Sequence, residues 1–553
     1  MKKICKISGK EFEVSQFEQE FLERVGPKFG GKKYRFPLPE LSPVERMRLR
    51  TMQRNEQNLF RNISAMDGAS ILSIYDDDRY KLYTHEQWWG NDWDPMEYGR
   101  EYDFSKGFFE QWAELDREVP RVALVQVNNE NCPYTTGTGY CRNCHLINCS
   151  ENCEDCIYGK LLQGCKDAID CAYGYDSELL YQCFYVKDCY NCVYVSYSQN
   201  SSECLFSENL KGCRNCFLST NLSNKEYYFM NKPVSKEQYE KLVSDCLGSY
   251  RGVEKAKEIL ARMRQERVHK YANMVNCEAS TGDFLTNCKN CVECFEVNDS
   301  EDCMYVQVGV EDKDVVDCSN MYLKPELSYQ VLGTIGTFDV HFSVYQFNAN
   351  NVLYSQFCHD SGNLFGCAGL RNKQYCVLNK QYTKEQYEEL VPRIIESMQE
   401  RGEWGQFFPA ESSPFAYNDT VAHQYVPLTK EEAMGRGYRW RDEEERAKGV
   451  VDYEIPDRIE EVEDDICEKV LVCEKSGRGY KVLPKELKFL RRMKMPVPRL
   501  CPDERHKERM SMRNGLDLFA RECGKCGAAV ESTFKPGDAR EIYCEKCYLE
   551  VVF

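Results

Sequence analysis

One cysteine-rich stretch in the first half of the chain sets its architecture. It reads CRNCHLINCSENCEDCIYGKLLQGCKDAIDCAYGYDSELLYQCFYVKDCYNC, residues 141–192. Its cysteines recur with a 24-residue period, in ladders that extend beyond the stretch on both sides. The ladders are Cys141, Cys165, Cys189 and Cys213; Cys144, Ala168, Cys192 and Cys216; and Cys132, Cys156, Leu180 and Cys204. Self-similarity at a period of about 20 to 50 residues is typical of solenoids.

Short apolar runs between the ladders predict which kind of solenoid this is. Cys183–Val186 and Cys192–Val195 are rich in aromatic and β-branched residues, have no helical periodicity and are separated by polar turns. The sequence therefore predicts a parallel β-helix with about one coil per 24-residue period. Each ladder then becomes a column of small buried side chains.

A second copy of the solenoid is predicted further along the chain. The segment YYFMNKPVSKEQYEKLV, from Tyr227, matches YCVLNKQYTKEQYEELV, from Tyr375, without a gap. Each segment ends a β-rich stretch and begins a helix. The helix starts carry capping boxes, formed by Ser235 with Gln238 and by Thr383 with Gln386. We interpret these helices as caps that close the open end of each β-stack.

The tail of the chain, ECGKCGAAVESTFKPGDAREIYCEKC, contains two Cys-x-x-Cys pairs with the spacing of a zinc ribbon. The predicted metal ligands are Cys523, Cys526, Cys544 and Cys547. Four cysteines fill the tetrahedral coordination of a zinc ion and leave no position for a catalytic water. We therefore expect one structural Zn²⁺ in this segment.

The two ends of the chain resemble each other. CKISGKEFEV at the N-terminus aligns with CEKSGRGYKV near the C-terminus, and the match continues into the zinc segment. This alignment places Ile63, Met66, Thr84 and Gln87 opposite the four tail cysteines. The sequence therefore predicts an N-terminal copy of the ribbon without metal, in which apolar residues occupy part of the empty site.

The cysteines in the middle of the chain allow three interpretations. Two sets have the spacing of iron–sulfur ligands, namely Cys149, Cys153 and Cys156, and Cys288, Cys291 and Cys294. A second metal site is a further candidate, formed by Cys141, Cys144, Cys153 and Cys156. Buried cysteine also fills a tight interior as a small hydrophobe. We favour packing, and an Fe–S redox or radical enzyme is the alternative.

Two sets of arginines lie at i, i+4 and i+8, so each set shares one helix face. They are Arg505, Arg509 and Arg513 near the C-terminus and Arg46, Arg50 and Arg54 in the first copy. Such residues commonly pair with nearby acids on a solvated helix. The functional alternative is an anion- or RNA-binding stripe beside the ribbon, as in an RNA- or ribosome-associated factor.

Composition and charge restrict the class of protein. The chain has 553 residues, 32 cysteines and a formal charge of −17, which argues against nucleic-acid binding by the whole surface. Residues 442–468 carry 13 acidic and 3 basic residues, net −10, whereas residues 469–521 carry 15 basic and 6 acidic residues, net +9. Neither a signal peptide nor a membrane span is predicted, so we expect a cytoplasmic protein without a membrane partner, its cysteines reduced.

With these features in place, the whole chain resembles a family of uncharacterised cysteine-rich zinc-ribbon proteins from bacteria of the candidate phyla radiation (Patescibacteria). The phrases that carry the resemblance are CKISGKEFEV, YCVLNKQYTKEQYEELVPRIIESM, GEWGQFFP, SPFAYNDTVA and the segment from CEKSGRGYKVLPKELKFL to MPVPRLCPDER. The resemblance implies a bacterial cytoplasmic protein with a structural zinc ribbon. It implies no activity.

The sequence thus predicts a mainly β fold with helices, in five parts. They are an N-terminal ribbon-like module with an aromatic linker (1–122), a first capped solenoid (123–270), a second (271–402), an aromatic then acidic linker (403–468) and a C-terminal basic helix with zinc ribbon (469–553). No phosphate loop, zinc-protease motif or nucleophile elbow is present. The sequence favours a non-enzymatic zinc-binding scaffold or binding protein whose partner is a protein or RNA, and it does not indicate a small-molecule substrate.

Overall fold

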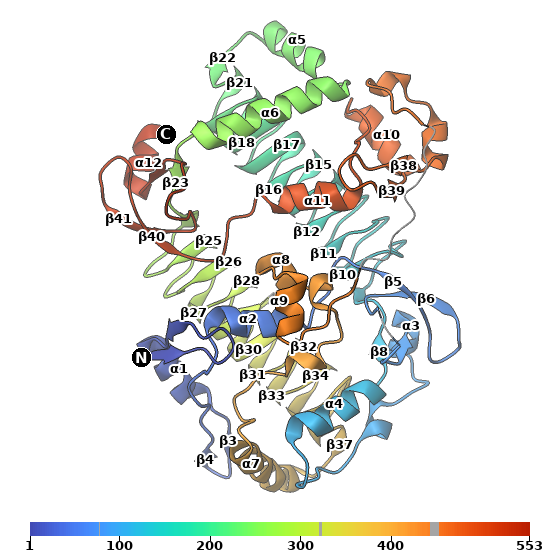
Figure 1. Ribbon diagram of the computed structural model, residues 1–553, viewed down its shortest axis with the longest axis vertical. Coiled ribbons are helices and arrows are strands. Elements are labelled where there is room, and N and C mark those ends of the chain that lie inside the picture. The colour runs from blue at the N-terminus through green and yellow to red at the C-terminus, as the bar shows by residue number, and fades with distance from the viewer. Residues whose placement is uncertain (77, 320–322, 443–452, 553) are drawn as a thin grey trace.

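The computed structural model describes residues 1–76, 78–319, 323–442 and 453–552. The fold is mainly β with helices, as the sequence predicts, and contains two large, mostly parallel 14-stranded sheets. The first runs from β9 (Gln126–Val127) to β22 (Lys232–Pro233), and the second from β24 (Met274–Val275) to β37 (Lys380–Gln381). We call them the first stack and the second stack. They extend in opposite directions from the middle of the molecule (Figure 1).

The chain runs through each stack in 12-residue coils. Lys160 pairs in parallel with Ala172, and Ala172 pairs with Phe184. The predicted 24-residue coil is therefore wrong by a factor of two. One interior column explains the error, because it alternates sulfur and oxygen over five coils: Cys165, Ser177, Cys189, Ser201 and Cys213. The composition repeats only every second coil, although the backbone repeats in every coil.

A left-handed residue at every third position shapes each coil. Asp167, Asp170, Tyr173 and Asp176 all have φ between 46° and 56°. Asparagine and aspartate tolerate this conformation best among residues with a side chain, and they are frequent at these corners. The residue after each corner points inward, as buried Cys171 does after Asp170. A 12-residue coil therefore has four corners and contributes one side chain to each of four interior columns.

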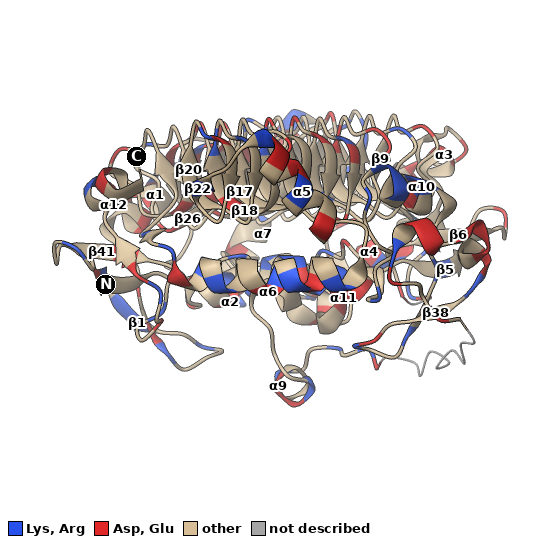
Figure 2. Ribbon diagram, turned by 90° about the horizontal axis from the view of Figure 1, so that it is seen from above, with Lys and Arg blue, Asp and Glu red and all other residues tan. Residues whose placement is uncertain are grey.

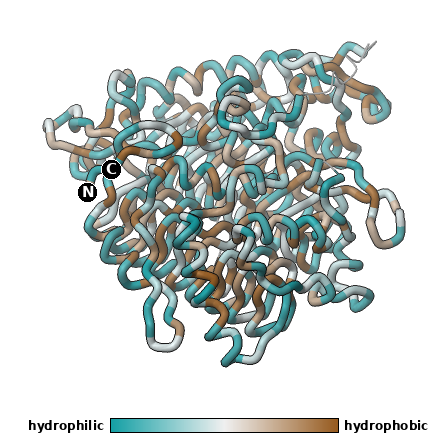
Figure 3. The backbone as a smooth tube through the Cα atoms, turned by 60° about the horizontal axis from the view of Figure 1, so that its bottom comes forward, coloured by the Kyte–Doolittle hydropathy of each residue, from teal (hydrophilic) through white to brown (hydrophobic). Residues whose placement is uncertain are grey.

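Thiols dominate the interior of the first stack, and all 32 cysteines of the chain are free. Interior thiols donate hydrogen bonds to backbone carbonyls nine residues ahead, as Cys144 Sγ does to Cys153 O (3.6 Å) and Cys156 Sγ to Cys165 O (3.5 Å). Figure 3 shows hydrophobic (brown) and hydrophilic (teal) residues interspersed along the coils. Small side chains of this kind fill the narrow interior, and each of these thiols donates to a carbonyl that already pairs with the neighbouring coil.

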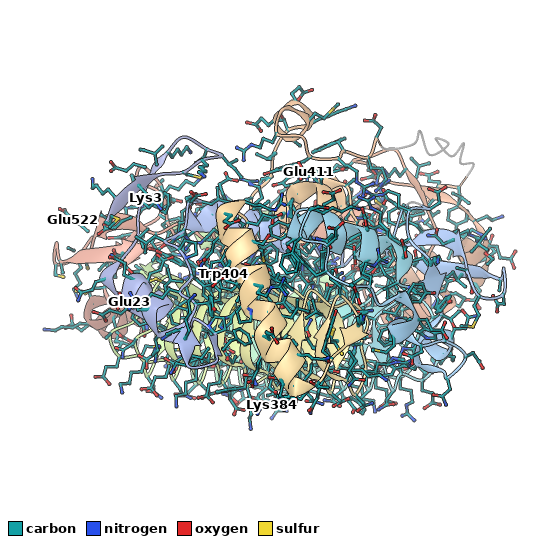
Figure 4. The ribbon with its side chains drawn as sticks, turned by 90° about the horizontal axis from the view of Figure 1, so that it is seen from below. Lys3, Glu23, Lys384, Trp404, Glu411 and Glu522 are labelled. Atoms are coloured by element: carbon teal, nitrogen blue, oxygen red, sulfur yellow. The ribbon has the colours of Figure 1, made fainter. Side chains whose placement is uncertain are left out.

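Helices pack at the outer ends of both stacks. α5 (Lys236–Cys246) contacts β19 (Arg214–Phe217) and β21 (Glu226–Phe229), and α7 (Lys384–Glu400) contacts β36 (Gln374–Val377). α7 crosses the end of the second stack, starting at Lys384 (Figure 4). Both predicted capping boxes are confirmed, with reciprocal bonds between Ser235 and Gln238 and between Thr383 and Gln386. Amphipathic helices thus cover β-edges that would otherwise face solvent.

Two terminal modules share one order of elements. The N-terminal module contains β1 (Lys2–Ile4), β2 (Glu11–Glu13), α1 (Gln16–Val25), α2 (Pro43–Thr51), β5 (Phe60–Ile63), β6 (Ser70–Ser73), β7 (Leu82–Tyr83) and α3 (His85–Trp89). The C-terminal module contains β38 (Leu471–Val472), β39 (Gly479–Tyr480), α10 (Pro484–Arg492), α11 (Pro502–Met510), β40 (Phe519–Glu522), β41 (Ala529–Ser532), β42 (Ile542–Tyr543) and α12 (Glu545–Val552). The order is hairpin, two helices, hairpin, strand and helix in both, apart from an additional hairpin of β3 (Lys28–Phe29) and β4 (Lys32–Lys33) between α1 and α2.

Each terminal module bridges the two stacks. In the N-terminal module, β7 pairs with β8 (Arg121–Val122), just before the first stack, while α2 packs on β29 (Lys313–Ser319) and β30 (Glu326–Ile335) of the second. The C-terminal module does the reverse: β42 pairs with β23 (His269–Lys270), just before the second stack, and α11 lies on the first (Figure 1). The modules therefore tie the stacks together.

α2, α11 and α6 (Tyr250–Glu266), which contacts the first stack, form one layer along the same side of the stacks (Figure 2). Aromatic residues near the linker join other parts together, as in the stacking of Trp112 on Phe408 with ring centroids 4.1 Å apart. Residues 443–452 of the predicted acidic linker lie outside the described residues. Within the described ranges, none of the helices has the length and apolarity needed to cross a bilayer.

Candidate metal centre

The four tail cysteines converge on one point. The sulfur atoms of Cys523, Cys526, Cys544 and Cys547 all lie within 4.8 Å of one another, and those of Cys526 and Cys544 are 3.8 Å apart. A tetrahedral ion with metal–sulfur bonds of about 2.3 Å separates its ligands by about 3.8 Å. The spacing of the thiols therefore fits a four-coordinate metal ion.

Backbone hydrogen bonds of the β40–β41 hairpin build the first half of this site. Cys523 N donates to Ala528 O (2.8 Å), and Gly527 N donates back to Cys523 O (2.9 Å). Gly527 has φ +71°, a conformation that glycine adopts without steric cost. Gly524 N bonds to Ile542 O (2.9 Å), so the hairpin is held against the strand that precedes the second cysteine pair.

The surroundings of Cys523 favour its thiolate. Burial opposes ionisation, but backbone N–H groups of Cys544, Cys526 and Lys525 point at the sulfur and lower the pKa of Cys523 to about 6. The thiolate is the form that binds a metal. Cys523 and Cys547 are buried whereas Cys526 is exposed, so the site lies at the surface.

In the N-terminal module, two of the four residues that the sequence alignment predicts stand at the equivalent positions and two do not. Ser64 N bonds to Ala69 O (2.8 Å) and Gly68 N to Ser64 O (2.9 Å), which reproduces the hairpin bonds around Cys523. The equivalents of Cys523 and Cys526 are therefore Ser64 and Asp67. Ile63 is 67% exposed. Ala65 N bonds to Leu82 O as Gly524 N does to Ile542 O, so Thr84 and Gln87 stand opposite Cys544 and Cys547 as predicted. The alignment is one residue out of register only at the first pair, because the segment between the two pairs is one residue shorter in the N-terminal module.

Hydrogen bonds stand in this module where the C-terminal module has its four thiols. Ser64 Oγ donates to Gln87 Oε1 (2.8 Å), and Gln87 Nε2 donates to Asp67 Oδ2 (2.8 Å). Thr84 N also donates to Gln87 Oε1 (3.0 Å), and Gln87 N to Thr84 Oγ1 (3.2 Å). The expected apolar filling is thus corrected to a polar network, because the open backbone groups of the hairpin need donors and acceptors rather than hydrocarbon.

The C-terminal arginines are buried against the first stack. Arg505 pairs through Nε with Asp170 Oδ2 (3.1 Å) and through Nη1 with Glu486 Oε1 (3.1 Å), and Arg509 Nη1 pairs with Asp170 Oδ1 (3.0 Å). Burial disfavours the charge on Arg505, but Asp170 and Glu486 outweigh it and raise its pKa. Arg513 reaches across to Glu296 of the second stack (2.9 Å).

The N-terminal arginines repeat this arrangement on the second stack. Arg46 pairs with Asp317 (2.6 Å) and Glu18 (2.8 Å), and Arg50 pairs with Asp317 (3.3 Å). Arg54 donates to Cys149 Sγ (3.0 Å) and pairs with Glu56 (2.6 Å). The two copies therefore use matched acids, Asp170 and Asp317 from the stacks and Glu486 and Glu18 from the modules.

Sequence reasoning did not identify these acidic partners. Glu18 and Glu486 occupy aligned positions in the two terminal copies, which was the available signal. Asp170 and Asp317 occupy corresponding coils of the two stacks, and this correspondence can be recognised only when the 12-residue length of the coil is known. RNA binding through the six arginines stays a prediction, and their burial in ion pairs does not favour it.

The middle cysteines do not all face the same interior. Cys149 sits at a corner, with φ 50°, and contacts Arg54, whereas Cys153 and Cys156 point into the stack. The structure therefore does not bring these three thiols together. Cys288, Cys291 and Cys294 all belong to the interior of the second stack. Among the described residues, the tail set alone has three or more metal-binding side chains mutually within 4.8 Å.

A cavity of about 790 Å³ lies between α11, α8 (Val421–Tyr425) and the first coils of the first stack. Its lining is mixed and includes Trp440, Asp419, His506 and Lys507. Lys507 pairs with Glu504 (2.8 Å), and Asp419 pairs with Arg441. These charges are compensated within the protein, so the cavity favours no ligand of one sign.

Comparisons with known proteins add no function to this geometry. No protein-family model matches the chain, and no curated protein matches it significantly. The resemblance to the cysteine-rich zinc-ribbon proteins stays a prediction.

Proposed function

We propose that this protein is a zinc-stapled scaffold or binding protein rather than an enzyme. In this proposal the two stacks are β-solenoids, the C-terminal module is a zinc ribbon, and the N-terminal module is its metal-free relative. The observation that carries the proposal is the tail site, where four thiols with tetrahedral spacing occupy every ligand position. An ion held in this way has no open position for substrate or water, so it stabilises structure.

The arrangement of the modules supports a scaffold. Each module pairs a strand with the segment that precedes one stack and places an arginine helix on the other stack. A metal at the tail would hold β42 against β23, ahead of the second stack. Metal binding then contributes to the free energy of folding rather than to chemistry. The rigid coil faces remain available to a protein or RNA partner.

The test is metal analysis of the full chain and two variants. Cys544→Ser removes one ligand, and Cys467→Ser removes a half-buried thiol outside the tail site as a control. We expect one zinc per chain in the wild type and in Cys467→Ser, and none in Cys544→Ser. We also expect the tail segment to be cleaved faster by protease in Cys544→Ser. Zinc that is retained in Cys544→Ser, or absent from the wild type, would overturn the proposal.

Two other functions stay predictions. RNA or ribosome association would need basic residues beyond the six arginines that are paired inside the protein. An Fe–S redox or radical enzyme would need thiols that converge, and Cys149 lies apart from Cys153 and Cys156. The same metal analysis addresses the second alternative, because it measures iron together with zinc.

A further inference from the structure

The interior of the first stack contains more sulfur than its backbone requires. Cysteines make up 13 of the 20 members of its interior cluster. The second stack has the same 12-residue coil, yet cysteines make up only 8 of the 18 members of its interior cluster. There Val331, Val340, Val352 and Leu364 fill positions of the same kind. The coil can therefore be built with hydrocarbon, and the thiols of the first stack are available for another role.

Four of these thiols form a compact group near the start of the first stack. The thiol quartet consists of Cys141, Cys144, Cys153 and Cys156, which occupy two adjacent columns in two successive coils. Cys141 interacts with Cys144 in its own coil and with Cys153 in the next, and Cys156 closes the square through Cys144 and Cys153. All four are at most 2% exposed.

The spacing of successive coils suits a different ion at the quartet from the one at the tail. Neighbouring strands are about 4.8 Å apart, and two sulfurs in line with one ion at bonds of about 2.3 Å are separated by about 4.6 Å. A tetrahedral zinc ion instead needs six sulfur separations of about 3.8 Å. Within the described residues the quartet does not meet the mutual 4.8 Å limit that the tail site meets. A two-coordinate ion between successive coils therefore fits better than zinc.

The mouth of the stack beside the quartet is polar. Gln126 Nε2 donates to Thr135 Oγ1 (2.9 Å), and Asn129 Nδ2 donates to Thr138 Oγ1 (2.7 Å). Thr138 lies three residues before Cys141, and Gln126 and Asn129 lie one coil earlier, so the quartet has polar neighbours on the side of the first coil. Cys132, at 6% exposure, is the first thiol behind them.

We propose that the thiol quartet is a copper(I) site, in which one ion bridges two cysteines of successive coils. Soft thiolates suit copper(I), zinc and iron–sulfur clusters, and of these copper(I) is the one that accepts linear two-coordination. Binding converts two thiols to thiolates and releases two protons, with no change of oxidation state. The other two thiols of the quartet remain protonated and donate to the new thiolates. The proposal does not depend on the zinc at the tail.

The test counts copper on the full chain, purified without oxygen, reduced and loaded with zinc so that the tail thiols are occupied. Copper(I) is supplied in the presence of bicinchoninate, whose coloured complex reports the copper that the protein does not take. The variant Cys144→Ser/Cys153→Ser removes one thiol from each successive-coil pair. The control Cys358→Ser/Cys367→Ser removes two fully buried thiols of the second stack, whose column neighbours are not cysteines.

We expect the wild type and the control to withdraw one more equivalent of copper than Cys144→Ser/Cys153→Ser, with the same zinc content in all three. Circular dichroism shows whether each variant has folded. Equal copper uptake by the three proteins overturns the site. If the quartet variant does not fold, the wild type still decides, because a wild type that leaves all copper with bicinchoninate refutes the proposal.

Discussion

Replacing Asp170 by asparagine should release the C-terminal arginine helix from the first stack. Asp170 is fully buried and is shared by Arg505 (3.1 Å) and Arg509 (3.0 Å). Asp170→Asn keeps the shape and removes the charge, so Arg505 is left with Glu486 as its acid and Arg509 with the neutral Gln182 Oε1 (2.9 Å). Removing one partner of a buried ion pair costs about 3–5 kcal/mol. We expect a loss of that size in the stability of the α11 contact.

Hydrogen exchange on peptides from α11 measures this loss locally, which suits a chain with several parts. At about 1.4 kcal/mol for each factor of ten, exchange should accelerate by roughly a hundredfold to a few thousandfold. Asp167→Asn is the matched control, because Asp167 pairs with the half-exposed Arg492 (3.0 Å), a contact worth about 0–1 kcal/mol. Equal exchange in both variants would refute the buried ion-pair argument.

Three further predictions concern other parts of the molecule. Gln87→Ala removes three side-chain hydrogen bonds from the polar network of the N-terminal module. We expect the free energy of unfolding of this module, measured in thermal melts, to fall by about 1–3 kcal/mol. His269 is buried and lies near cationic Arg267, which together lower its pKa to about 4, below about 6.5 in the unfolded chain. Because the pKa of His269 is lower in the folded protein, its contribution to the free energy of unfolding is complete above pH 6.5 and falls by about 3 kcal/mol as the pH drops towards 4. His269→Gln should flatten this pH dependence in thermal melts recorded at several pH values. Gly282→Ala should prevent the second stack from forming its first coils, because a Cβ would lie 1.7 Å from Cys294 O, whereas Gly515→Ala, in open space, should melt like the wild type.

Part of the fold could be predicted from the sequence because it is repetitive. The ladders through Cys141 and Cys144 indicate stacked coils, and the matched segments before Ser235 and Thr383 indicate two copies that end in capped helices. The tail site is equally local, since two Cys-x-x-Cys pairs bring four thiols together. In each case, side chains that are close in sequence or separated by a fixed period must meet.

The length of the coil and the role of the arginines could not be read in this way. The coil is set by the left-handed corners, and a column such as Cys165, Ser177 and Cys189 has the appearance of a 24-residue period. The arginines alone give no sign of burial, because their acidic partners in the stacks are about 220 to 340 residues away in the chain.

The stacked coils, the two terminal copies and the four-thiol site follow from the sequence alone, because spacing along the chain carries that information. The bridging of both stacks by each terminal module emerges from the three-dimensional fold. The three-dimensional fold also places Ser64, rather than Ile63, at the position of Cys523. It likewise brings Asp170 and Asp317 to the buried arginines. These contacts join segments with no fixed separation. A buried charge without an opposite charge beside it is costly, so the fold must bring an acid to each buried arginine, and no local pattern records this requirement.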